Sequence, residues 1–113
     1  NLMKMDILKE VYYGLVSEND ALTKVEHIFD GIRKGMYDKF KTDDTHIDLA
    51  AIMGMDNYEY TAYCQAAPLS VVAKWRYEGW PNQCCTTGRD LNYKNYHWIV
   101  KRCSDGTYGL MLV

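Results

Sequence analysis

The segment between Thr42 and Ala73 contains no lysine and no arginine. Binding to DNA depends heavily on contacts between these side chains and phosphate, so the absence argues against nucleic-acid binding through this segment. Residues 74–102, by contrast, hold six basic residues against two acidic ones, although the net charge of the whole chain is only −2. The segment without cations instead carries five carboxylates, those of Asp43, Asp44, Asp48, Asp56 and Glu59.

Other features are also missing. No apolar run approaches the roughly 18 residues that a membrane-spanning helix needs. The first residues do not have the layout of a signal peptide, so we expect a cytoplasmic protein whose natural start is Met3 or Met5. No glycine-rich phosphate loop is present, and the spacing of Asp43, Asp44 and Asp48 is not that of an EF-hand loop.

The length of 113 residues predicts a single domain, 1–113, and 48% hydrophobic residues suffice for a core. The pattern predicts a helical part over 1–80 and a loop and β-hairpin part over 81–113.

The helical part is predicted to contain about five helices. Apolar residues at 3–4 spacing predict helices over 2–16 and from Ser17 to about Lys39, the second with the stripe Leu22, Val25, Phe29, Ile32, Met36 and Phe40. A short helix ending at Gly54, a helix from Asp56 to Ala67-Pro68, and a helix over 69–78 follow.

The last 33 residues have a different texture. Trp98, Ile99 and Val100 predict one strand and residues 108–113 a second, joined through the turn dipeptide Asp105-Gly106. The fold class is therefore predicted to be α+β, an N-terminal helical body with a small C-terminal β-hairpin.

Four cysteines raise the question of metal binding: Cys64, Cys84, Cys85 and Cys103. The string Cys84-Cys85-Thr86-Thr87-Gly88 resembles one knuckle of a zinc ribbon, Cys-x-x-Cys-Gly, but Thr87 occupies the second ligand position. His97 and Cys103 could complete a site, yet structural zinc usually takes two close ligand pairs. We therefore expect no metal and no other cofactor, and keep a degenerate zinc-ribbon module as an alternative.

No catalytic set stands out. The imidazoles are His27, His46 and His97, and no Ser/His/Asp order accompanies them. A nucleophilic pair of Cys84 or Cys85 with His97 can be drawn, but any chain with four cysteines permits such a pairing. We predict that the protein is not an enzyme.

The string Asp48–Asp56, followed by a helix, has the rhythm of a helix-turn-helix unit. Asn57 and Gln65 could read a base edge from the second helix. This helix offers no cation, however, and Asp56 and Glu59 would face phosphate. A helix-turn-helix regulator of DNA is thus a second alternative, and we expect no nucleic-acid partner and no membrane partner.

Four motifs over roughly residues 45–98 carry a family resemblance. They are Tyr58-Glu-Tyr-Thr-Ala-Tyr63, Trp75-Arg-Tyr-Glu-Gly-Trp-Pro81, Cys84-x-x-Thr-Gly88 and Asn92-Tyr-x-x-Tyr-x-Trp98. Their succession is similar to that of a group of small bacterial proteins in which the Cys-x-x-Cys-Gly knuckle is often intact. Such domains resemble the immunity proteins of contact-dependent inhibition and other polymorphic toxin systems.

This resemblance implies a protein that binds a cognate toxin domain, such as a nuclease, and blocks its active site. A concentrated acidic patch would steer association with a basic cleft, and tyrosines are favoured interface anchors. The expected electrostatic contacts are Asp43, Asp44, Asp48, Asp56 and Glu59, and the expected anchors are Tyr58, Tyr60 and Tyr63, at least one of which should face the core.

Overall fold

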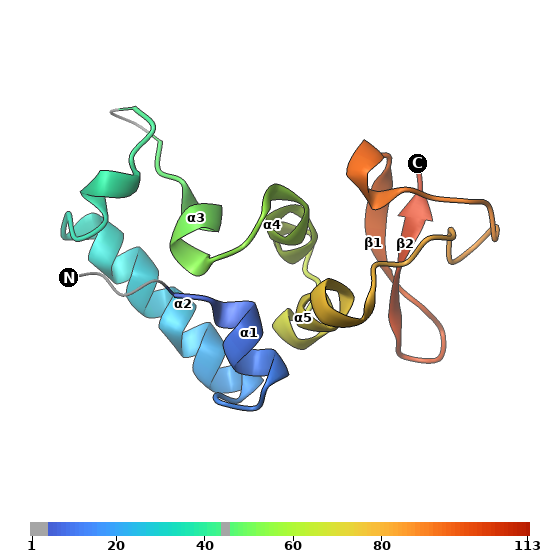
Figure 1. Cartoon of the computed structure of the whole chain (residues 1–113), viewed down its shortest axis with the longest axis horizontal. Helices are drawn as coiled ribbons and strands as arrows, with labels where there is room; N and C mark the ends of the chain where they lie inside the picture. Colours follow the sequence, from blue (N-terminus) through green and yellow to red (C-terminus); the bar gives the residue numbers. More distant parts are fainter. Residues whose placement is uncertain (1–4, 44–45) are drawn as a thin grey trace. The chain divides into compact units, whose positions relative to one another are not determined.

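A computed structural model describes residues 5–43 and 46–113 of the chain. These residues form five α-helices followed by a C-terminal antiparallel hairpin, which confirms the predicted α+β class (Figure 1). The chain divides into two compact units, the first ending at Asp56 and the second beginning at Asn57. The second unit therefore holds the last helices of the predicted helical part together with the predicted loop and hairpin part.

The first unit begins with two helices, α1 (Ile7–Tyr12) and α2 (Glu18–Arg33). Ser17 caps α2 as its sequence predicted, because its hydroxyl oxygen accepts a hydrogen bond from the Asp20 amide at 3.1 Å. Lys24 of α2 forms an ion pair with Glu10 of α1. The part of the predicted first helix that covers residues 2–4 lies outside the described residues.

The prediction that the second helix continues to Lys39 is wrong. The helix stops at Arg33 because Gly35 adopts the left-handed conformation, with φ +78°. The Met36 amide then donates to the Gly31 carbonyl at 2.9 Å, and the Gly35 amide donates to Ile32 at 3.1 Å, which is the Schellman arrangement of a helix C-terminus. Residues Asp38–Phe40 form the separate 3-10 helix η1.

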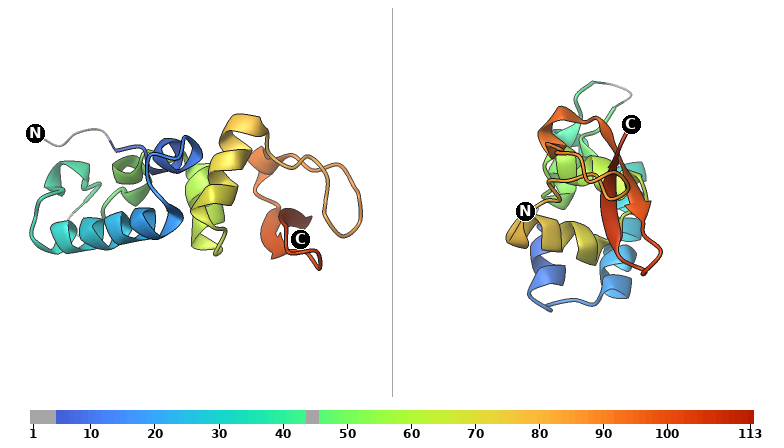
Figure 2. Two further views of the ribbon diagram at one scale, coloured as in Figure 1. Left: turned by 90° about the horizontal axis from the view of Figure 1, so that it is seen from below. Right: turned by 90° about the vertical axis from the view of Figure 1, so that its right-hand side faces the viewer.

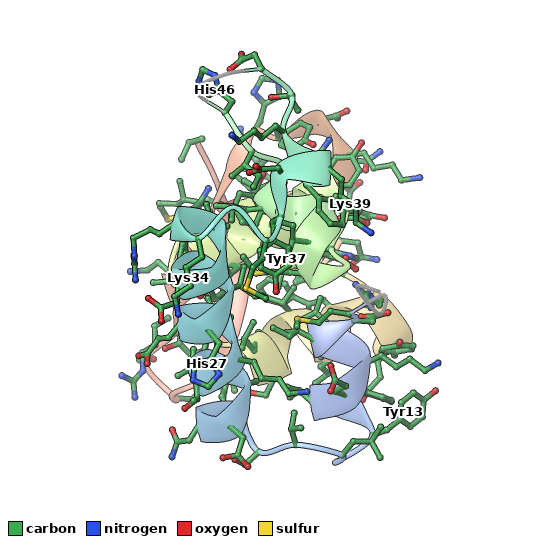
Figure 3. The ribbon with its side chains drawn as sticks, turned by 90° about the vertical axis from the view of Figure 1, so that its left-hand side faces the viewer. Tyr13, His27, Lys34, Tyr37, Lys39 and His46 are labelled. Atoms are coloured by element: carbon green, nitrogen blue, oxygen red, sulfur yellow. The ribbon has the colours of Figure 1, made fainter. Side chains whose placement is uncertain are left out.

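The face of α2 that is buried also differs from the predicted stripe. Ala21, Val25, Ile28 and Gly31 are the buried positions, whereas Leu22 and Phe29 are 42% and 41% exposed. Small residues let a neighbour come close here, since a Cβ on Gly31 would lie 2.6 Å from the Tyr37 ring (Figure 3). Of the six residues in the predicted stripe, only Val25 is buried.

The chain returns from η1 to the last helix of this unit, α3 (Leu49–Met53), through a short antiparallel turn. Lys41 and Ile47 form an isolated β-bridge, and the Asp48 amide donates to the Phe40 carbonyl at 2.9 Å. Gly54 ends α3 in the left-handed conformation, as predicted from its position.

The second unit contains α4 (Asn57–Cys64), α5 (Leu69–Glu78), the 3-10 helix η2 (Tyr93–Asn95) and the strands β1 (Trp98–Arg102) and β2 (Tyr108–Leu112). The bounds of α5 and the hairpin agree with the sequence prediction. The two strands lie side by side in antiparallel register, with Lys101 opposite Gly109 (Figure 2). The Gln65 side chain ties α4 to the sheet, because its Oε1 accepts a hydrogen bond from the Val100 amide at 2.7 Å.

Among the helices that the structure describes, none combines the length and the apolar character needed to cross a bilayer.

Replacing Gly54 by alanine should destabilise the first unit. The left-handed backbone, at φ +76°, costs a residue with a side chain about 1–2 kcal/mol, and the new Cβ would also lie 2.3 Å from the Met5 carbonyl oxygen. Gly14→Ala is the matched control, since Gly14 has a similar φ of +71° but nothing within 4 Å. Urea unfolding of both variants checks this, and equal midpoints would contradict the close contact at Gly54.

Candidate functional site

The predicted acidic site begins in the turn between η1 and α3. The Asp43 carboxylate accepts hydrogen bonds from the His46 amide and contacts the His46 ring Nδ1, each at 2.9 Å. Both side chains remain more than half exposed, so this carboxylate is accessible while it shapes the turn. Asp44 lies outside the described residues.

Asp48 and Asp56 are exposed as well. Asp48 caps α3, with its carboxylate accepting a hydrogen bond from the Ala51 amide at 3.0 Å. Two lysines lie close to this site in the sequence. Lys41 pairs with Asp38 at 3.3 Å, and Lys39 is exposed on η1 (Figure 3). Both lysines precede the cation-free segment, and Lys41 pairs with a carboxylate outside the predicted acidic site.

Glu59 has a different position from the other carboxylates. It is 3% exposed, and Arg76 of α5 holds it through two hydrogen bonds of 2.7 Å, from Nε and Nη2 to the two carboxylate oxygens. A bidentate pair of this kind is internally satisfied. In this conformation Glu59 links α4 to α5 and does not present its charge to a partner.

Tyr58, in the first turn of α4, belongs to a continuous group of rings, here called the aromatic cluster: Tyr58, Trp75, Trp80, Tyr93, Tyr96 and Trp98. Trp80 stacks on Tyr93 with ring centroids 4.5 Å apart and an interplanar angle of 6°. Tyr58 meets the edge of Tyr93 at 5.1 Å and stacks on Tyr96 at 4.8 Å. The Trp98 indole N–H is satisfied by the Tyr93 carbonyl at 2.7 Å.

Tyr96 is the exposed member of the aromatic cluster, with 46% of its surface accessible. Its backbone is left-handed, with φ 60°, where a residue with a side chain costs about 1–2 kcal/mol. Strained positions of this kind concentrate at functional sites. Sequence reasoning did not select Tyr96, although the motif Asn92-Tyr-x-x-Tyr-x-Trp98 contained it.

The other two predicted anchors lie further along α4. Tyr60 and Tyr63 contact each other with ring centroids 6.5 Å apart, and both are half-buried. Burial raises the pKa of Tyr63. The fully buried positions of α4 are Glu59 and Ala62, and the three tyrosines are half-buried.

The segment that resembles a zinc knuckle forms a tight turn. The Gly88 amide donates to the Cys84 carbonyl at 2.9 Å, the Cys84 amide donates to Arg89 at 2.8 Å, and Gly88 is left-handed. The buried Cys84 sulfur accepts a hydrogen bond from the Leu112 amide and lies 3.3 Å from the Thr86 hydroxyl. Hydrogen bonds from Thr86, Thr87 and this amide lower the pKa of Cys84 to about 6.

Among residues 5–43 and 46–113, no three His, Cys, Asp or Glu side chains lie close enough to hold a metal ion together. Cys84, Cys85, His97 and Cys103 are all described, so the structure does not assemble them into a zinc-ligand set. The knuckle's turn is instead held by its own backbone hydrogen bonds.

The helix-turn-helix alternative involves α3 and α4. Helix α3 ends the first compact unit and α4 opens the second. Asn57 is exposed at the start of α4, whereas Gln65 bonds the hairpin through Val100. The regulator hypothesis stays a prediction, with Gln65 already engaged inside the protein.

Comparison with known proteins found no matching family model, no matching curated protein and no matching solved structure.

Replacing Glu59 by alanine should destabilise the second unit by about 3–5 kcal/mol, because the largely buried Arg76 guanidinium loses the carboxylate that accepts two of its hydrogen bonds. The double variant Glu59→Ala/Arg76→Met should recover part of this loss, since it also removes the remaining buried charge. Urea unfolding measures both. A single variant as stable as the wild type would show that the pair carries no stability.

The pH dependence of stability should carry a contribution from Cys84. Its pKa falls from an ordinary 9.0 in the unfolded chain to about 6 in the fold. The stabilisation is therefore complete above pH 9, decreases below it, and is lost as the pH falls through about 6. The unfolding free energy of the wild type, relative to that of Cys84→Ser, should increase as the pH rises from about 6 to 9. A difference that does not change with pH would contradict the lowered pKa.

Proposed function

We propose that this chain is a non-enzymatic immunity protein that binds a cognate bacterial toxin domain and neutralises it by occluding its active site. The observation that carries the proposal is the exposed Tyr96 ring, stacked on Tyr58 and held by a left-handed backbone. Rigid, partly exposed tyrosines supply large contact areas at low entropic cost, and residues of this type dominate binding energy in protein interfaces.

The aromatic cluster makes Tyr96 a preorganised anchor. Tyr58 stacks on the Tyr96 ring. Tyr93, which is itself stacked on Trp80, makes an edge contact with Tyr58. A side chain already fixed in its bound position loses little freedom when a partner covers it. Its position between Asn95 and His97, both exposed, gives it the polar rim that surrounds interface anchors.

The exposed carboxylates of the first unit supply the electrostatic part of the proposal. Asp43, Asp48 and Asp56 face solvent, whereas Glu59 does not. The first unit holds seven basic and eleven acidic residues, so it is net negative, while the second holds six and four and is net positive. A toxin domain with a basic substrate cleft would be steered toward the first unit.

The role implies a cytoplasmic location, where an incoming toxin domain is met. The test is co-expression with the toxin domain encoded next to this gene, with growth and complex formation as readouts. Growth rescue together with a purified stoichiometric complex would support the proposal. Continued killing, or a toxin domain that stays unbound when both folded proteins are mixed, would overturn it.

Within that complex, Tyr96→Ala should raise the dissociation constant about 10- to 100-fold, since an anchor of this kind is worth about 2 kcal/mol or more. The loss should lie mainly in the dissociation rate. Tyr96→Phe keeps the stacked ring and should bind nearly normally. Tyr13→Ala, which removes a 58% exposed tyrosine from the first unit, is the matched surface control.

The carboxylates should instead affect the association rate. The double variant Asp43→Asn/Asp48→Asn keeps the amide-accepting oxygens that shape the turn and cap α3, and removes only the charge. It should associate more slowly at low salt and show a weaker salt dependence. An unchanged association rate would remove the first unit from the encounter surface, leaving the Tyr96 test intact.

A further inference from the structure

Two cysteines from opposite edges of β2 lie over the same glycine. The Cys85 amide donates to the Leu110 carbonyl at 2.9 Å on one edge, and the Cys103 amide donates to Thr107 at 2.7 Å on the other. A Cβ added to Gly109 would lie 3.1 Å from the Cys85 Cβ, 3.7 Å from its sulfur and 3.9 Å from the Cys103 sulfur. A side chain at this position would therefore crowd the Cys85 Cβ and contact both sulfurs.

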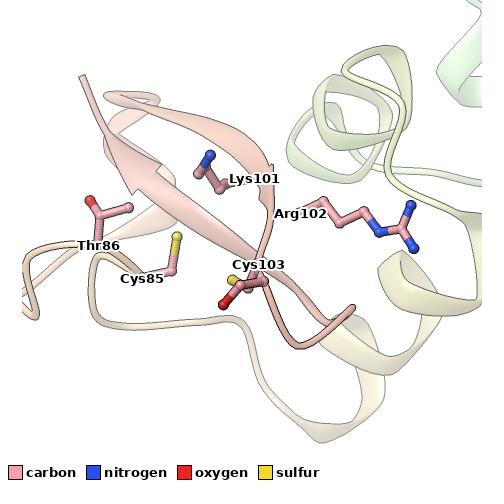
Figure 4. A pocket seen from close by; sticks show the side chains of 6 residues that line it. Cys85, Thr86, Lys101, Arg102 and Cys103 are labelled. Atoms are coloured by element: carbon pink, nitrogen blue, oxygen red, sulfur yellow. The ribbon is translucent and has the colours of Figure 1, made fainter.

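The two thiols are neighbours, since both sulfurs lie within 4 Å of one point, the Cβ position of Gly109. Cys85 is exposed and Cys103 is partly exposed. Both line an open pocket of about 410 Å³, together with Thr86, Lys101, Arg102 and Ser104 (Figure 4). A paired dithiol is therefore open to solvent at a hollow large enough for a small molecule.

Lys101 gives this pocket a positive charge on the face that carries the thiols. It stands directly opposite Gly109 in the sheet register, and opposite residues of an antiparallel pair project from the same face. Arg102, the next residue of β1, projects from the other face and extends away from the sulfurs in Figure 4. Lys101 is exposed and can meet an anionic group of a ligand that approaches the thiols.

We propose that Cys85 and Cys103 form a thiol–disulfide exchange site that takes small anionic disulfides, with Lys101 binding an anionic group of the disulfide. The proposal is independent of the toxin-binding function and uses different residues.

The exchange has two balanced steps. The Cys103 thiolate attacks one sulfur of the small disulfide, forming a mixed disulfide and releasing one small thiolate, which takes up a proton. The Cys85 thiolate then attacks the Cys103 sulfur and releases the second small thiolate. The chain loses two protons and two electrons, and the small disulfide is reduced to two thiols.

The second step requires the segment that carries Cys85 to move toward Cys103, because a disulfide needs the sulfurs about 2 Å apart. Cys85 lies in the loop between α5 and η2, outside the strands, so this shift leaves the β1–β2 ladder in place. Burial, and then the hydrogen bond to Cys103, raise the pKa of Cys85. Exchange should therefore accelerate as the pH rises, since the thiolate is the attacking form.

The experiment uses the full chain in the Cys64→Ser background, which removes the exposed thiol of α4. Incubation with oxidised glutathione should produce an intramolecular disulfide, seen as the loss of two hydrogens by mass and mapped to Cys85 and Cys103. Cys85→Ser should instead trap a glutathionyl group on Cys103. Lys101→Gln should slow the reaction with oxidised glutathione several-fold, while the reaction with uncharged 2-hydroxyethyl disulfide stays the same.

Lys74→Gln, which removes an exposed lysine of α5 that does not line the pocket, is the matched control and should change neither rate. A disulfide mapped to Cys84, a glutathionylated wild-type chain that never closes to the intramolecular bond, or equal rates for Lys101→Gln and Lys74→Gln with oxidised glutathione would each overturn the proposal. Gly109→Ala gives a second readout that leaves all thiols in place, because the added methyl would lie only 3.1 Å from the Cys85 Cβ and so hinder the movement of Cys85 toward Cys103. Unimpaired closure in that variant would also overturn it.

Discussion

The parallel stack of Trp80 on Tyr93 is the contact on which the second unit depends. It joins the end of α5 to η2, two segments separated by a loop with little regular structure. Trp80 also meets Trp75 and Trp98, so one ring connects helix, loop and strand. Offset and tilted aromatic pairs add about 0.5–1.5 kcal/mol each beyond the area they bury. Both candidate sites of this unit rely on that anchorage, since Tyr96 follows η2 directly and the cysteine knuckle lies in the loop that the stack closes.

The carboxylates of the acidic segment have separate structural roles, whereas the sequence predicted that they act together as one acidic patch. The predicted block runs across the boundary between the two compact units, and its members have separate tasks. Asp43 orders a turn, Asp48 caps a helix, and Glu59 is neutralised inside the protein by Arg76. A carboxylate that stabilises the fold can still steer a charged partner over long range if it is exposed. Asp43 and Asp48 are exposed, and Glu59 is not.

Patterns with a local physical cause were predicted well from the sequence. Helix α5 and the hairpin were predicted because proline, glycine and an Asp-Gly turn determine where the chain can and cannot continue. The end of α2 was missed because the apolar spacing continues through Met36 and Phe40, whereas the left-handed backbone of Gly35 terminates the helix. The buried face of α2 was missed because Ala21 and Gly31 pack closely, and periodicity of large apolar residues does not register small ones.

The candidate sites were less accessible to sequence reasoning, because they depend on residues distant in the chain. Tyr58 was selected for its type, but the stack with Tyr96 brings together positions 38 residues apart. Cys85 and Cys103 were considered as metal ligands, while their arrangement around Gly109 emerges only from strand register.

Gly109 has a consequence for how this protein can diverge. A glycine in the interior of a strand weakens the sheet slightly, and almost any replacement would suit the strand better. At Gly109, however, the new side chain would crowd the Cys85 Cβ at 3.1 Å, beside the two sulfurs. The fold and the thiol chemistry can therefore diverge independently. A related chain could keep every cysteine and both strands, yet lose the reactive thiol pair through one substitution at Gly109.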